Sequence, residues 1–249
     1  MKKFIASLLC GILTATALTG CGSSSAGGEN GEVIVYNWGE YIDPDTITMF
    51  EEETGIKVVY DEFETNEIMY PKVEAGSSAY DVVCPSDYMV QKMIGNDLIQ
   101  EIDYDKIPNA KANIGEQYYE QAAAYDPGNK YCIPYCWGTV GIIYNKTMVD
   151  TPPTKWADLD YVIPEEGTNV WIDGWVIPKN APNKENAEKF IDFMCRADVA
   201  LKNFEYITYG TPNVAARELI EDEELKNSPI AFPDLSQYHN LETFLYLGT

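Results

Sequence analysis

The sequence predicts an α/β protein whose first half is organised around a parallel sheet. Three short segments are apolar, β-branched or aromatic over a length typical of buried strands: 33–37, 56–60 and 80–84. Two segments with helical start and stop signals lie between them, at 44–54 and 65–75. Because strands that alternate with helices tend to pair in parallel, this order favours a parallel α/β sheet.

The two helices are each marked by their flanking residues. Asp43 followed by Pro44 supplies an N-cap and a first-turn proline, and Gly55 closes the helix. The second helix begins at Thr65 and stops at Gly76. These start and stop signals define the helices that separate the three predicted strands.

The second half of the chain predicts a further set of helices and one long strand. A polar helical stretch at 109–124 is followed by an apolar, glycine-containing run at 131–145, interpreted as a crossover between two lobes. A proline pair precedes a short helix at 156–159, and a strand is expected at 170–177. Three helices are expected after it, at 184–195, 198–206 and 214–220. A loop at 209–213 is expected between the last two.

The first residues have the features of an exported lipoprotein. Residues 1–20 carry two lysines, an apolar run and a small-residue cleavage site, the pattern of a signal peptide. The ending before Cys21 resembles a bacterial lipobox, so lipidation of Cys21 and a flexible tether over 21–31 are expected. This predicts an extracytoplasmic protein anchored to the membrane by lipid. The alternative is an ordinary signal peptide whose cleavage site happens to contain a cysteine.

The charge balance is strongly acidic. The chain holds 40 acidic and 17 basic residues, a formal net charge of −23. Such a field repels nucleic acid, which is therefore not expected as a partner. It attracts cations, although many extracellular proteins are acidic only for solubility.

Four cysteines remain beyond the signal segment and Cys21. They are read as small, buried or half-buried side chains, with a disulfide left open because the sequence cannot choose a pairing: Cys84, Cys132, Cys136 and Cys195. No metal and no other cofactor is expected, since these cysteines lack metal-site spacing and the single histidine, His239, lies far from them in sequence.

Signatures of catalysis are missing. The chain has no glycine-rich phosphate loop before a helix and no nucleophile elbow, so an enzyme is not expected. A hydrolase that uses a pair of carboxylates stays open as an alternative, because forty acids always offer some pair.

Aromatic residues gather where a ligand would lie. In parallel α/β sheets ligands bind beyond the carboxyl ends of the strands. Predicted strand ends and loops carry five aromatic residues near one acid, Asp173: Trp38, Tyr41, Tyr88, Trp171 and Tyr209. Aromatic faces attract ammonium groups and a carboxylate hydrogen-bonds to them, so the set suits a flexible molecule with methylene segments and amines. The competing interpretation is that these aromatics belong to the core.

At these residues the chain closely resembles the bacterial spermidine/putrescine-binding proteins of ABC transporters. The most specific stretches are 35–41, 80–88, 133–138, 171–175 and 209–213. The resemblance implies a two-lobe fold of the type II periplasmic-binding-protein kind, a polyamine ligand and a transporter permease as partner. A monomer is expected.

The resemblance also implies roles for individual residues. Trp38 and Tyr41 would line the polyamine channel, and Ser86 and Tyr88 would make polar contacts. In the second lobe Trp171 would pack on the methylene chain, Asp173 would hold an amine, and an aromatic loop residue would complete the site: Tyr209.

One departure from the family stands out. Family members carry a long second-lobe segment where this chain joins Leu159 directly to Asp160. The expected domains are a complete lobe over 32–135 and a crossover with a truncated lobe over 136–249, and weaker polyamine binding follows as a hypothesis. Two further alternatives stay open: a binding protein for another small organic cation, and a degenerate product without a working site.

Overall fold

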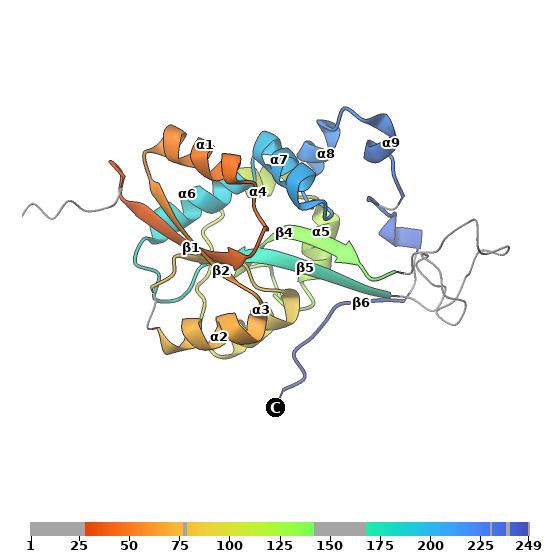
Figure 1. Ribbon diagram of the computed structural model, residues 1–249. Coiled ribbons are helices and arrows are strands. Elements are labelled where there is room, and N and C mark those ends of the chain that lie inside the picture. Colours follow the sequence, from red (N-terminus) through yellow and green to blue (C-terminus); the bar gives the residue numbers. More distant parts are fainter. Residues whose placement is uncertain (1–27, 77–78, 142–167, 230, 238–239, 249) are drawn as a thin grey trace, which may run out of the picture.

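The computed structural model describes residues 28–76, 79–141, 168–229, 231–237 and 240–248. Its strands join in one sheet in the order β2-β1-β3-β5-β4, with β6 paired to β5 (Figure 1). Their bounds are β1 Glu32–Trp38, β2 Lys57–Phe63, β3 Val82–Val83, β4 Cys132–Thr139, β5 Thr168–Val176 and β6 Leu241–Glu242. The α/β class predicted from the sequence is therefore confirmed.

The sheet is mixed rather than wholly parallel. The first three strands pair in parallel as predicted, with β1 between β2 and β3. In contrast, β5 runs antiparallel to both β3 and β4. Part of the run expected to cross between lobes is thus a strand, β4, along which residues 132–137 are all buried. The division into two lobes stays a prediction.

The first two helices follow their predicted caps. Helix α1 spans Pro44–Thr54, where the Asp43 side chain accepts a hydrogen bond from the backbone of Asp45 and Gly55 ends the helix with φ of 69°. Helix α2 spans Asn66–Ala75, is capped by Thr65 and ends at Gly76 with φ of 59°. Both glycines adopt the left-handed conformation that favours glycine.

The remaining helices agree with the sequence in part. Helix α3 was not predicted, and the stretch expected at 109–124 divides into α4 and α5 around Gly115. The later helices lie where they were predicted, with a short α9 and a 3-10 turn η2 added. The bounds are α3 Asp87–Gly95, α4 Pro108–Asn113, α5 Glu116–Ala122, α6 Lys184–Met194, α7 Ala197–Ile207, α8 Val214–Glu218, α9 Glu223–Lys226 and η2 Leu235–Gln237.

Helices cover both faces of the sheet. Figure 1 shows α1, α6 and α7 on one side and α2 and α3 on the other. Phe50 of α1 meets Phe190 and Phe193 of α6 edge-on, with ring centroids 5.4 and 5.3 Å apart. Trp175 of β5 lies beneath Phe190 at 5.7 Å and is fully buried. This aromatic cluster joins elements from the first and second halves of the chain into one core.

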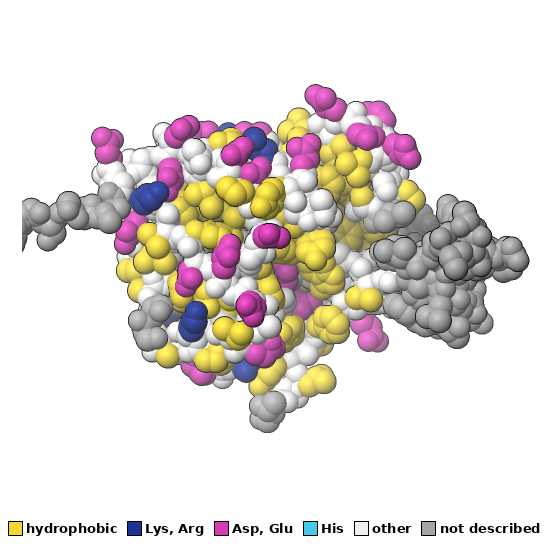
Figure 2. Space-filling view, in the orientation of Figure 1, with side chains coloured by type: hydrophobic (Ala, Val, Ile, Leu, Met, Phe, Trp, Pro, Cys, Tyr) yellow, Lys and Arg dark blue, Asp and Glu magenta, His cyan; other side chains and the backbone are white. Residues whose placement is uncertain are grey.

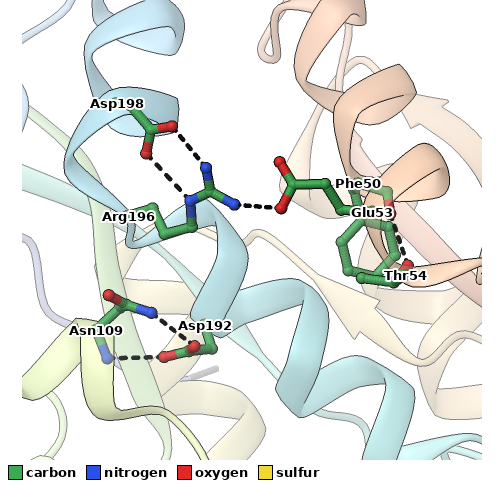
Figure 3. A network of polar contacts seen from close by, with 7 residues as sticks. All are labelled: Phe50, Glu53, Thr54, Asn109, Asp192, Arg196 and Asp198. Carbon is green, nitrogen blue, oxygen red and sulfur yellow. Dashed lines mark hydrogen bonds and ion pairs between the residues drawn. The ribbon is translucent and has the colours of Figure 1, made fainter.

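Polar contacts reinforce the same junction at the surface (Figure 3). The Arg196 guanidinium bridges Glu53 of α1, at 2.6 Å, and Asp198 of α7, to which it donates two hydrogen bonds. Nearby, the backbone and side chain of Asn109 both donate to Asp192 at 2.7 Å. Exposed ion pairs contribute little to stability. The bidentate contact with Asp198 is local to the start of α7, and the single contact with Glu53 is the one that links α7 to α1.

The four cysteines in the described ranges are buried and have free thiols. Burial raises the pKa of each thiol: Cys84, Cys132, Cys136 and Cys195. They therefore serve as small core side chains, as the sequence suggested, and no disulfide joins them. In the part of the chain that the structure describes, no helix combines the length and the apolar character needed to cross a bilayer.

Several sequence predictions lie outside the described residues. They are the signal segment, Cys21, most of the tether, the short helix at 156–159, the junction of Leu159 with Asp160, and His239.

Candidate functional site

A pocket of about 500 Å³ opens where β1 and β3 end beside the middle of β5. Its volume lies in the range typical of small-molecule sites, about 300–1,000 Å³. Every ligand-binding residue predicted from the sequence lines it: Trp38, Tyr41, Ser86, Tyr88, Trp171, Asp173 and Tyr209. Strand ends, a crossing strand and the loop after α7 thus bring together residues that lie up to 171 positions apart in the chain, Trp38 and Tyr209.

The acid at the centre of this pocket is Asp173. Its side chain is buried, and the Tyr41 hydroxyl donates to its Oδ2 at 2.8 Å. The Ser86 hydroxyl donates to the same carboxyl group. Burial raises the pKa of Asp173 to about 6, against the smaller lowering effect of the two hydroxyl donors. A buried carboxylate held by neutral donors is a favourable partner for a cation.

The backbone fixes Asp173 opposite Ser86. The two residues form an antiparallel bridge, and the Gly174 N–H donates to the Pro85 carbonyl at 3.2 Å. A side chain at Gly174 would place its Cβ 2.3 Å from the sulfur of Cys132. Glycine is therefore required at this position for β5 to pack closely against β4 and to present its acid to the pocket.

Aromatic rings form the walls of the pocket. Trp38 donates from its indole nitrogen to the Cys84 carbonyl at 2.8 Å, which fixes the ring at the end of β1. Tyr41 lies 6.4 Å from Trp38 and 5.9 Å from Tyr209, and Tyr209 lies 5.2 Å from Trp171, measured between ring centroids. Tyr209 is 49% exposed, whereas Tyr41 is almost fully buried. Tyr41 thus serves both the core and the pocket.

The opposite wall is polar. Asn66 donates to the Tyr88 hydroxyl at 3.0 Å, and that hydroxyl donates to Glu67 at 2.9 Å. Burial is the main reason why the pKa of Tyr88 is raised to about 12, so the hydroxyl stays protonated. Helix α2 therefore holds the Tyr88 ring at the pocket edge.

Sequence reasoning missed four residues that line the pocket: Gly39, Asn66, Asp87 and Phe244. Asp87 had a readable signal, since it is an acid between two predicted site residues at the end of a strand. Phe244 had none, because its place depends on β6 returning along β5 near the C-terminus.

Asp87 is the second carboxyl group of the pocket. It is fully buried, and its Oδ1 accepts a hydrogen bond from the Tyr88 N–H at 2.7 Å. Burial, with a smaller contribution from the charge of Asp173, raises the pKa of Asp87 to about 7. The residues that line the pocket include no lysine or arginine, so nothing on its wall neutralises the two acids. Acidic side chains also outnumber basic ones across the face shown in Figure 2.

The fold and this pocket define a binding protein for a small molecule. The family model for bacterial extracellular solute-binding proteins matches residues 45–162 and 158–233, and the chain belongs to this family. The two matched stretches meet at 158–162, where the sequence predicted that an internal segment is missing.

Relatives narrow the comparison to polyamine-binding proteins. The spermidine/putrescine-binding periplasmic protein of Escherichia coli is 31% identical over 93% of this chain and 91% of its own length. The putrescine-binding periplasmic protein SpuD of Pseudomonas aeruginosa is 36% identical over 90% of this chain and 57% of its own length. The fold is also similar to that of the spermidine/putrescine transporter substrate-binding protein PotD of Streptococcus pneumoniae, with a TM-score of 0.79, 33% identity, and coverage of 88% and 93% of the two chains. The resemblance inferred from the sequence is confirmed.

The alignment with the Escherichia coli relative extends over 322 positions, although this chain has 249 residues. That relative therefore contains residues that have no counterpart here. These additional residues of the relative agree with the prediction that a segment is missing after Leu159.

Proposed function

We propose that this chain is an extracytoplasmic binding protein that captures polyamines and delivers them to an ABC transporter. The observation that carries the proposal is Asp173, a buried carboxyl group inside an aromatic pocket that has no basic residue on its wall. The names of the relatives point to the same ligand class. Membership in a solute-binding family does not favour the alternative of an acid-pair hydrolase.

Each part of the pocket suits a feature of a polyamine. An ammonium group on Asp173 would form a charge-assisted hydrogen bond worth about 1.5–3 kcal/mol. Aromatic faces such as those of Trp171 and Tyr209 would add about 0.5–2 kcal/mol for each cation–π contact. The same rings would pack on the methylene groups. Both kinds of contact grow stronger when water is excluded.

The gap after Leu159 is expected to weaken the site. A shorter second lobe offers fewer ligands and less apolar surface to close over the polyamine. Binding of spermidine and putrescine is therefore expected to be weaker than that of the full-length Escherichia coli relative. Parallel calorimetric titrations of the two proteins test this, and equal affinities would contradict it.

A direct test of the function is calorimetric titration of the wild-type chain with putrescine and spermidine, alongside Asp173→Asn. The amide keeps the shape of the side chain but loses its charge, so affinity is expected to fall by about 10- to 100-fold. Asp105→Asn, at an exposed acid that does not line the pocket, is the control for the loss of one negative charge. Absence of binding by the wild-type chain would refute the proposal.

A quaternary ammonium compound is the second candidate ligand. The four rings of Trp38, Tyr41, Trp171 and Tyr209 favour it, because aromatic faces attract a cation that has no N–H donor. Titration with choline separates the two ligands, since a polyamine site should bind choline more weakly than putrescine.

The remaining parts of the proposal concern location and partners. The chain is proposed to be lipidated at Cys21, to act as a monomer and to dock on a membrane permease. Incorporation of labelled palmitate into the wild-type chain, and its loss in Cys21→Ser, tests the anchor. Sedimentation of the unlipidated chain tests the oligomeric state.

A further inference from the structure

A chain of hydrogen bonds runs along the polar wall of the pocket. The Ser86 N–H donates to Asn66 Oδ1 at 3.3 Å, and Asn66 Nδ2 donates to the Tyr88 hydroxyl at 3.0 Å. That hydroxyl donates in turn to Glu67 Oε1 at 2.9 Å. Asn66, Ser86 and Tyr88 line the pocket, whereas Glu67 is not part of its wall. The hydrogen bonds therefore link residues of the wall to a carboxylate outside it.

The two ends of this chain of hydrogen bonds fix the direction of the protons in it. A backbone N–H can only donate, so the amide oxygen of Asn66 faces Ser86 and its amide nitrogen faces Tyr88. A carboxylate can only accept, so Tyr88 directs its proton to Glu67. The Tyr88 oxygen keeps a lone pair but has no other proton to offer. It can therefore accept a hydrogen bond from a ligand but cannot donate one.

This polarity of the Tyr88 hydroxyl suits an amine. A primary ammonium group carries N–H donors and no acceptor. We propose that Glu67 is a positioning residue of the site: by accepting the Tyr88 proton, it leaves the Tyr88 oxygen as an acceptor for an N–H of the polyamine. This inference rests on the proposed function. Glu67 itself makes no contact with the ligand, because its effect passes through Tyr88.

Two simpler roles for Glu67 make different predictions. Glu67 lies in the first turn of α2, where a negative charge is favourable. If that were its only role, its loss would lower stability and leave ligand affinity unchanged. If it attracted the ligand through its charge alone, any neutral replacement would weaken binding equally. The proposed role instead requires a hydrogen-bond acceptor at position 67 and a hydroxyl group at position 88.

The fold contains the same arrangement at a place that does not line the pocket. Asn96 donates to the Tyr70 hydroxyl at 2.9 Å, and that hydroxyl donates to Glu74 at 2.8 Å. Glu74 belongs to α2, as Glu67 does. Glu74→Ala is therefore a matched control, since it removes one charge and one tyrosine partner from the same helix.

The first test is calorimetric titration with putrescine at pH 8 in about 0.15 M salt, which screens distant charges. In Glu67→Ala the Tyr88 proton is free to turn toward the ligand, so affinity is expected to fall by about 3- to 10-fold. Glu67→Gln still offers a carbonyl oxygen to the Tyr88 hydroxyl, so its affinity should stay within about twofold of wild type. Glu74→Ala should stay within the same limit.

The second test repeats Glu67→Ala in a Tyr88→Phe background. Without the hydroxyl, position 67 has no proton to accept, so the added substitution should change putrescine affinity by less than about twofold. A further loss in this background would overturn the inference, because Glu67 would then act without Tyr88. Equal losses in Glu67→Ala and Glu67→Gln, or unchanged affinity in Glu67→Ala, would overturn it too.

These outcomes leave the proposed function intact, because the wild-type chain would still bind putrescine. A wild-type chain that does not bind putrescine would overturn the proposed function and this inference with it. Thermal unfolding of each variant verifies that it folds. If Glu67→Ala does not fold, Glu67→Met replaces it, since methionine has a similar length and offers only a weak acceptor.

Discussion

Replacing Asp173 by asparagine should make the unliganded protein more stable at pH 8 while weakening its binding. The pKa of this carboxyl group is raised from 3.8 to about 6, chiefly by burial. A rise in pKa of this size corresponds to about 3 kcal/mol by which the folded state disfavours the charged form. The amide removes that charge, and its oxygen can still accept from the hydroxyls of Tyr41 and Ser86.

The direction follows from proton linkage. A carboxyl group whose pKa is higher in the folded state binds more protons there, so its contribution to stability falls as pH rises from about 4 to about 6. Above that window the full penalty is present, and below it there is none. The advantage of Asp173→Asn should therefore reach its maximum at pH 8 and largely vanish near pH 4.

Differential scanning calorimetry of the two proteins without ligand measures this effect. For a chain of this size each kcal/mol shifts the melting temperature by about 2–4 °C, so the full effect would be about 6–12 °C. About half is expected, since the amide makes weaker hydrogen bonds than the carboxylate. Asp105→Asn should show no comparable gain. A variant less stable than wild type at pH 8 would refute the view that desolvation dominates at Asp173.

Three further outcomes are expected. Gly210→Ala should destabilise the fold by about 1–3 kcal/mol in urea denaturation, because the new Cβ would lie 2.7 Å from the indole nitrogen of Trp137 and 3.0 Å from its carbonyl oxygen. Asn213→Ala should lower the free energy of unfolding by about 1–3 kcal/mol, because its buried side chain caps α8 through the Ala216 N–H and donates to the Cys195 carbonyl at 2.8 Å. The four buried thiols should not react with a thiol reagent in the native protein and should all react after denaturation, because burial raises the pKa of each. Rapid labelling of any of these four in the native protein, identified by peptide mapping, would contradict their burial.

Local signals accounted for the elements that depend on local chemistry. The caps of α1 and α2 could be recognised from the residue types at the helix ends. They are Asp43, Gly55, Thr65 and Gly76. The strand partners were harder. A β-branched run states that a strand exists, but it does not say that β5 would pair antiparallel between β3 and β4, since that choice is made by tertiary packing.

The candidate site was accessible to sequence reasoning for a related reason. Trp38 is the last residue of β1 and Ser86 lies shortly after β3, and the ends of parallel strands meet at one edge. Asp87 was passed over although its position between Ser86 and Tyr88 could be read from the sequence, and its complete burial exists only after folding. The place of Phe244 at the pocket could not be predicted from the sequence, because it depends on the long-range pairing of β6 with β5.

Strand β5 brings Trp171 and Asp173 into the same hydrogen-bonded sheet as the end of β3 that precedes Ser86. The contact between Tyr41 and Asp173 is therefore held by the folded sheet and its adjoining residues, and it does not require a domain movement. One end of a ligand would bind to residues around Asp173 that are already in position, independently of the arrangement of the rest of the protein. Recognition of the head of an amine should thus persist when residues outside this sheet are changed.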